Sequence, residues 1–112
     1  MKNSIDANLP LSEQTYFILL SLGTGPKHGY AIIKDVLSLS NGRVVLSVST
    51  LYTTLKRLLD DKWIKLIDTT DSNRPRKIYE LTKMGGTVLS IEIQRLGALL
   101  SAAQASGMGG VL

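Results

Sequence analysis

The spacing of hydrophobic residues changes along this chain, and each change marks a predicted element. Apolar residues cover most sides of residues 12–22, which predicts a buried helix with Ser12 as its N-cap. The spacing in residues 29–39 predicts a second helix, which ends at the turn-forming pair Asn41-Gly42. Residues 43–46 are rich in β-branched side chains, and this composition is compatible with a very short strand.

The segment that begins at Ser47 predicts a third helix, ending near Asp60, with two dissimilar faces. One face is a stripe of leucines at helical spacing, made of Leu51, Leu55, Leu58 and Leu59. The other face carries hydroxyl groups toward its start and cations toward its end, namely Ser49, Thr50, Tyr52, Thr53, Lys56 and Arg57. Such a face suits contact with phosphates and base edges in a DNA groove. Taken alone, the segment also fits an ordinary surface helix whose polar face is solvated.

A β-hairpin is predicted to follow the third helix. Residues 63–67 alternate apolar and polar, and residues 77–81 form a second β-prone run. The polar, turn-rich stretch 68–76 joins them as a long tip. The tip and its flank carry the basic residues Arg74, Arg76 and Lys77, which would lie on phosphates or in the minor groove.

A long last helix is predicted for residues 82–105, with Thr82 as its N-cap and a length of roughly 35 Å. Its apolar residues follow a heptad-like 4-3-4-3 spacing, in the series Leu89, Ile93, Leu96, Leu100 and Ala103. This seam predicts a dimer interface with a second copy of the chain.

The order helix, helix, helix, hairpin, long helix predicts a mainly α fold with a small β-hairpin. It is the order of a winged helix-turn-helix followed by a C-terminal dimerisation helix, with the third helix in the major groove of DNA. We expect an N-terminal arm at 1–11, a DNA-binding domain at 12–81, a dimerisation helix at 82–106 and a flexible tail at 107–112. A dimer would favour double-stranded DNA with an inverted repeat.

Composition is consistent with this prediction. The 112 residues suit one domain, and the formal net charge of +4 is compatible with a nucleic-acid partner without requiring one. The chain has no cysteine, so disulfides and cysteine zinc sites are excluded. No apolar run is long enough to span a membrane, and residues 1–9 lack the apolar run of a secretory signal. We therefore expect a cytoplasmic protein.

Catalytic and metal chemistry find no support in the sequence. Asp60 and Asp61 are adjacent at a helix end, so their carboxylates diverge, and no nucleophile-plus-base pattern or phosphate loop occurs. We expect no catalytic residue, no metal and no cofactor. His28, the only histidine, is expected to close the turn before the second helix rather than to sense pH or a ligand. Tyr30 and Tyr79 are expected to pack in the core or on the hairpin.

Four motifs, in register over residues 10–100, resemble the PadR-like transcriptional regulators. The stretch Pro10 to Leu22 is similar to the family's first helix, and Gly25-Pro-Lys-His-Gly-Tyr-Ala-Ile-Ile33 is similar to its Pro-x-His-Gly-Tyr-x-Ile motif. Ser49-Thr-Leu-Tyr-Thr-Thr-Leu-Lys-Arg-Leu58 resembles its Gly-Thr-Leu-Tyr-x-x-Leu-x-x-Leu recognition helix. Arg76-Lys-Ile-Tyr79, followed by Leu81-Thr-x-x-Gly85, resembles its last motif.

The resemblance implies a homodimeric repressor of the small subfamily with a short final helix. It also implies that Tyr52 and its polar neighbours approach DNA. The chain departs from the family pattern at Ser49 and Lys62, where glycine is usual, and at Thr53-Thr54, where Pro-Ala is frequent. Some relatives that sense drugs place an aromatic residue on the last helix, near the position of Leu96 here. The aliphatic side chain argues against a flat aromatic ligand.

Other functions remain open from sequence alone. A winged helix can bind protein instead of DNA, since fold does not fix function. A DNA-binding dimer could also take a small hydrophobic effector in its central cavity.

Overall fold

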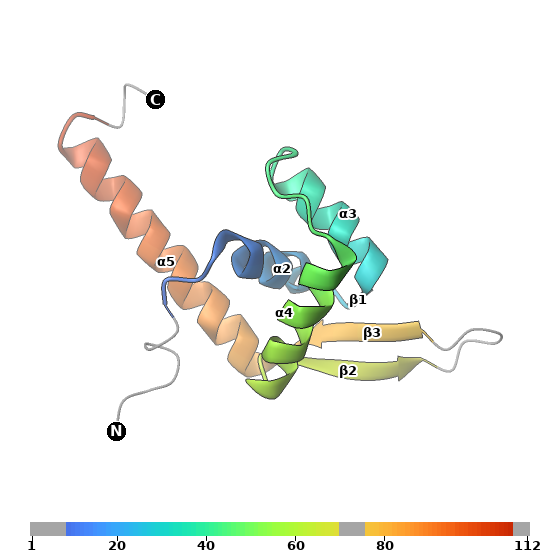
Figure 1. Cartoon of the computed structure of the whole chain (residues 1–112). Helices are drawn as coiled ribbons and strands as arrows, with labels where there is room; N and C mark the ends of the chain where they lie inside the picture. Colours follow the sequence, from blue (N-terminus) through green and yellow to red (C-terminus); the bar gives the residue numbers. More distant parts are fainter. Residues whose placement is uncertain (1–8, 70–75, 109–112) are drawn as a thin grey trace.

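The computed structural model describes residues 9–69 and 76–108 and contains helices and one small sheet (Figure 1). The expected tip residue Arg74, most of the N-terminal arm and the end of the tail lie outside the described residues, as does the side chain of Arg76. In chain order the elements are α2 (Glu13–Gly23), β1 (Lys27–His28), α3 (Gly29–Leu39), α4 (Val48–Asp60), β2 (Ile64–Thr69), β3 (Arg76–Leu81) and α5 (Lys83–Ala105).

Every described helix begins at a side chain that caps it. The hydroxyls of Ser12, Ser47 and Thr82 accept the backbone N–H three residues ahead, at 3.1, 3.0 and 3.1 Å. His28 caps α3 in the same way, with Nδ1 accepting from the backbone N–H of Ala31 at 3.3 Å. These side chains satisfy donors that the first helical turn leaves without a partner. They confirm the predicted starts of the helices and the turn-closing role of His28.

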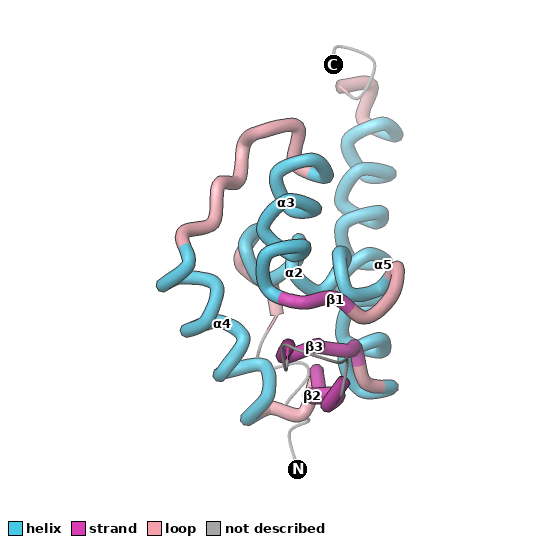
Figure 2. The backbone as a smooth tube through the Cα atoms, turned by 90° about the vertical axis from the view of Figure 1, so that its right-hand side faces the viewer, coloured by secondary structure: helices cyan, strands magenta, loops and turns pink. Residues whose placement is uncertain are grey.

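The sheet has three antiparallel strands in the order β1-β3-β2. Lys27 and His28 lie opposite Tyr79 and Ile78 of β3, and Figure 2 shows β1 against β3 at the start of α3. The short strand expected at residues 43–46 is therefore wrong. Those residues are the loop between α3 and α4, and the pairing edge of β3 is taken by β1.

The core lies where α2, α3, α4 and the first half of α5 meet the sheet. Leu51, Leu55 and Leu58 of α4 are fully buried, which confirms most of the predicted leucine stripe, and Leu59 is partly buried beside them. They pack in one cluster with residues of every other helix and of the sheet, including Ile18, Leu19, Ile32, Val36, Trp63, Tyr79 and Val88. Burying this face of α4 leaves its polar face outward.

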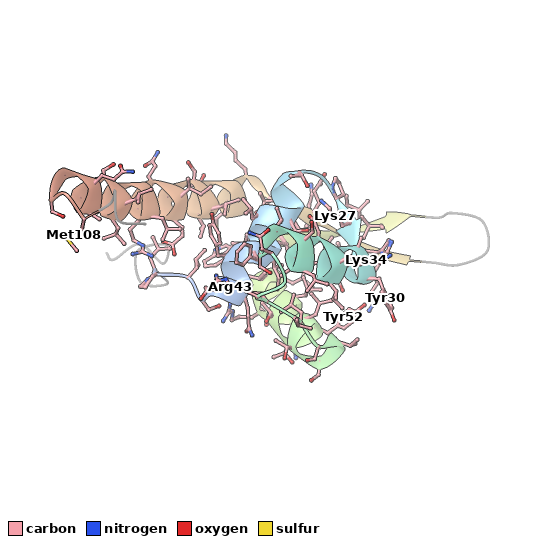
Figure 3. All side chains as sticks on the ribbon, turned by 90° about the horizontal axis from the view of Figure 1, so that it is seen from above. Lys27, Tyr30, Lys34, Arg43, Tyr52 and Met108 are labelled. Atoms are coloured by element: carbon pink, nitrogen blue, oxygen red, sulfur yellow. The ribbon has the colours of Figure 1, made fainter. Side chains whose placement is uncertain are left out.

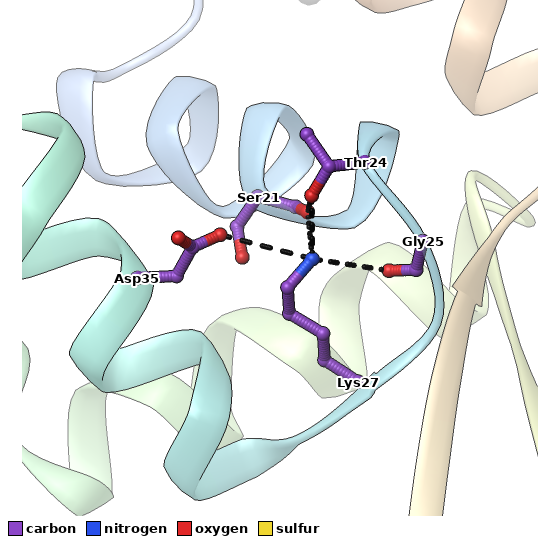
Figure 4. Close-up of polar contacts among 5 residues, drawn as sticks. All are labelled: Ser21, Thr24, Gly25, Lys27 and Asp35. Carbon is purple, nitrogen blue, oxygen red and sulfur yellow. Dashed lines mark hydrogen bonds and ion pairs between the residues drawn. The ribbon is translucent and has the colours of Figure 1, made fainter.

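A lysine holds the turn between α2 and α3 (Figure 4). The ammonium of Lys27 donates to the carbonyl of Ser21 and to Oγ1 of Thr24, the latter at 2.7 Å, and lies 3.7 Å from a carboxylate oxygen of Asp35. A cation at the end of α2 is favoured because the last carbonyls of a helix carry partial negative charge. The side chain thereby ties the end of α2 to β1 and to α3.

The hairpin and the second half of α5 project on opposite sides of the domain (Figure 3). The first half of α5 packs on α2, and Glu92 marks the end of this contact. The buried Glu92 carboxylate accepts the backbone N–H of Leu11 at 2.8 Å and the guanidinium of Arg95 at 2.6 Å. Beyond this point α5 leaves the domain core.

Candidate nucleic-acid interface

The outward face of α4 is made of hydroxyls and a lysine. Ser49, Thr53 and Lys56 are exposed, and the ring of Tyr52 is 46% exposed. The hydroxyl of Thr50 takes part in the helix cap, since its Oγ1 accepts from the capping hydroxyl of Ser47 at 2.9 Å. The structure thus brings most of the sequence-predicted residues of this helix onto one accessible face.

Arg57 lies apart from this face. Its guanidinium donates to Oγ1 of Thr15 on α2 at 2.6 Å, so it reaches back toward the N-terminal helix. This hydrogen bond links α4 to α2, while the side chain of Arg57 remains exposed, and the DNA contact expected from sequence stays a prediction. Helical spacing alone did not reveal this bond, because the acceptor is 42 residues away in the chain.

Tyr52 leans against the start of α3. A Cβ placed on Gly29 would lie 2.6 Å from the Tyr52 hydroxyl, so the missing side chain of Gly29 makes room for the ring. Burial raises the pKa of the Tyr79 hydroxyl, and nearby Tyr52 raises it further. Tyr52 therefore lies against the start of α3, in space that the absence of a side chain at Gly29 leaves open.

A cleft of about 460 Å³ opens where these elements meet, lined by His28, Gly29, Tyr30, Tyr52 and Lys77. Lys77 is exposed on β3, as expected for a basic residue of the hairpin. Tyr30 was expected to pack in the core or on the hairpin, and this expectation is wrong because the side chain is 72% exposed. It occupies the first turn of α3, on the side that faces away from the core, and lies near Tyr52 at one edge of the molecule (Figure 3).

The second half of α5 exposes an apolar face. Ile93, Leu96 and Leu100 are 44%, 39% and 50% exposed, and Ala103 is half-buried. Leu89 was expected in the same seam, but it is only 7% exposed and belongs to the core of its own domain. It packs there because this part of α5 still contacts α2. Leu99 and Met108, which were not singled out from sequence, are 57% and 63% exposed.

A second cleft, of about 360 Å³, lies between α2 and α5. Tyr16 and Phe17 stack edge to face within it, at 5.3 Å between ring centres, beside Leu11 and Leu96. Its charged side chains are already paired, Arg43 with Glu13 and Arg95 with Glu92. The hydrogen bond from Arg95 holds the pKa of the Glu92 carboxyl below its usual value, despite burial, and the Leu11 N–H acts in the same direction.

Among the described residues there is no cluster of histidine, aspartate or glutamate side chains that could hold a metal ion. Within the same residues, no helix has the length and apolar character needed to cross a membrane.

The helix pair α3 and α4, with the polar face of α4 outward and the β2–β3 hairpin after it, defines the winged helix class of proteins. The family model that matches the chain is the transcriptional regulator PadR-like family, over residues 18–91. The chain belongs to this family, whose members are transcriptional regulators and not enzymes. A comparison with curated proteins finds no match.

Solved structures of PadR family proteins have the same fold. The chain is similar to a PadR family transcription regulator from Clostridium difficile, with a TM-score of 0.72 and 25% identity over 84% of this chain and 97% of that one. It is similar to a transcriptional regulator from Clostridium thermocellum, with a TM-score of 0.69 and 20% identity over 93% and 97%. It also resembles Bacillus subtilis PadR in complex with operator DNA, with a TM-score of 0.63 and 28% identity over 70% of this chain and 45% of that one.

Proposed function

We propose that this regulator binds double-stranded DNA with the outward face of α4, and that it acts in the cytoplasm as a homodimeric repressor. The observation that carries the proposal is the exposed polar face of α4. Ser49, Thr53 and Lys56 are exposed on a helix whose opposite side is fully buried, so the helix is presented rigidly. In a winged helix-turn-helix this element enters the major groove. Residues 12–81 form the DNA-binding unit and residues 82–106 the dimerisation helix.

The solved complex of Bacillus subtilis PadR with operator DNA supports a DNA partner for this chain. The exposed Lys77 lies on β3, beside the cleft that Tyr52 also lines. Phosphate contacts from a basic hairpin would orient α4 in the groove, while side chains of α4 read base edges. Arg74 and Arg76 are proposed to extend the same contact along the backbone.

The exposed apolar face of α5 supports a homodimer. Ile93, Leu96, Leu99 and Leu100 form a patch on a helix that projects from the domain, and burial of such a patch favours association. A two-fold dimer would place two copies of α4 about one turn of DNA apart, roughly 34 Å. An inverted repeat is the sequence that matches this symmetry.

A small hydrophobic effector is proposed to release the repressor, and the cleft between α2 and α5 is a suitable site. It contains the Tyr16–Phe17 pair and borders Leu96 of the proposed dimer face. A ligand there would contact the DNA-binding unit and the dimerisation helix together. Thermal-shift measurements with a panel of apolar compounds test this proposal, and a uniform lack of stabilisation would count against it.

The DNA proposal is tested by fluorescence anisotropy with a labelled duplex from the region upstream of the gene for this protein. We expect tight binding at 50 mM salt and a loss of at least about tenfold in affinity at 200 mM, because lysine and arginine contacts release counterions from DNA. A random duplex should bind more weakly with a similar salt dependence. No binding to either duplex at 50 mM salt would contradict the proposal and favour a protein partner.

A further inference from the structure

The cleft between α3, α4 and β3 has a lining that is suited to an anion. Its described lining residues are His28, Gly29, Tyr30, Tyr52 and Lys77, and none of them carries a carboxylate. A cleft of about 460 Å³ is large enough for a phosphate group with its flanking atoms. The Tyr30 ring, at 72% exposure, stands at this cleft without being part of the core.

The polar side chains among the described lining residues can all donate hydrogen bonds. Nδ1 of His28 accepts from the backbone N–H of Ala31, so the neutral imidazole carries its proton on Nε2. Tyr30 and Tyr52 contribute hydroxyls, and Lys77 contributes an ammonium. Phosphate oxygens are acceptors only, and they match a set of donors that includes one cation.

We propose that this cleft binds a backbone phosphate of DNA and that Tyr30 is a DNA-contacting residue. The inference rests on the proposed function and adds to it a residue of α3, outside the recognition helix and the hairpin tip. A DNA phosphate is proposed as the occupant because the cleft is continuous with the surfaces that are proposed to contact DNA. Tyr52 belongs to α4 and Lys77 to β3, so the cleft joins the two surfaces that are proposed to contact DNA.

The position of Tyr30 on α3 is consistent with such a contact. It lies in the first turn of an 11-residue helix, where the dipole favours negative charge. The turn that leads to it is fixed by the ammonium of Lys27, which bonds to the end of α2 and faces Asp35 of α3. The backbone that carries Tyr30 is thus positioned by the packing of α2 on α3 and by the contact of Tyr52 with the start of α3.

The substitution Tyr30→Phe tests the inference, because it removes one hydroxyl from an exposed ring and leaves the fold intact. We expect affinity to fall about 5- to 10-fold for the upstream duplex and for a random duplex alike, since phosphate contacts carry no sequence information. The salt dependence should stay unchanged, because no charge is lost. Lys77→Gln should instead lower the slope of log K against log salt by about 1.

Ser90→Ala is the control, since it removes one hydroxyl from an exposed side chain of α5 that lines neither cleft. It should bind both duplexes as the wild type does. If the wild type binds DNA and Tyr30→Phe binds equally well, the inference is wrong and the proposed function stands. A loss confined to the upstream duplex would assign Tyr30 to a base and overturn the phosphate contact. A wild type that binds neither duplex would overturn the proposed function and the inference with it.

Discussion

Replacing Gly85 with alanine is expected to destabilise the domain by about 3 kcal/mol or more. A Cβ at this position would lie 2.0 Å from the backbone oxygen of Trp63 and 2.8 Å from Cδ1 of Leu81. The oxygen cannot retreat easily, because it accepts the backbone N–H of Thr82 at 3.0 Å, and Trp63 itself is buried. Thermal unfolding followed by circular dichroism should show a fall in Tm of roughly 12 °C or more.

Gly86 provides the matched control for this prediction. A Cβ on Gly86 would meet only Cδ2 of Leu81, at 3.9 Å, which is ordinary van der Waals contact. Alanine is favoured over glycine within a helix by about 1 kcal/mol, so Gly86→Ala should keep or raise the Tm. Equal Tm values for the two variants would mean that α5 does not begin against Trp63 as described.

Introducing glutamate at both Leu96 and Leu100 is expected to abolish the dimer and to weaken DNA binding by about 100-fold or more. Both side chains are exposed in the single chain, so the substitutions leave the domain core intact. In the proposed dimer they would bury like charges next to one another without partners, which costs several kcal/mol. DNA affinity falls as well, because each α4 would then bind its half-site without the help of a linked second copy.

Sedimentation and anisotropy measure the two effects of this double substitution. The control is Gln94→Glu with Ala98→Glu, which adds the same charge on the opposite, exposed side of α5. This variant should remain dimeric and bind DNA. A Leu96→Glu and Leu100→Glu protein that stays dimeric would remove α5 from the interface.

The parts of the fold that depend on residues a few positions apart in the chain were predictable from sequence. Ser47 and Thr82 were recognisable as caps because their hydroxyls bond to residues three positions ahead. Lys62, which stands where the family usually has glycine, has a φ of 62°, the left-handed conformation that glycine favours after a helix. The leucine stripe of α4 likewise follows from helical periodicity alone.

Features that depend on distant residues were not predictable. β1 is a strand only because β3 lies opposite, and Lys27-His28 has no strand pattern of its own. Leu89 fits the heptad spacing as well as Leu96 does, but α2 covers only the first of the two. Tyr30 was assigned to packing because tyrosine is often buried in part, whereas the register of α3 turns it outward. Each of these depends on tertiary packing that one sequence does not specify.

The most direct test of the central proposal is the DNA affinity of a protein with Tyr52→Ala and Lys56→Ala. Both residues are exposed on the face of α4 that is proposed to enter the groove. Lys83→Ala is the control for the lost charge, since Lys83 is exposed at the start of α5. Anisotropy with the upstream duplex should show a loss of about 30-fold or more for the double variant, corresponding to about 2 kcal/mol, and little change for the control. A double variant that binds this DNA as tightly as the wild type would contradict the assignment of α4 as the DNA-reading helix.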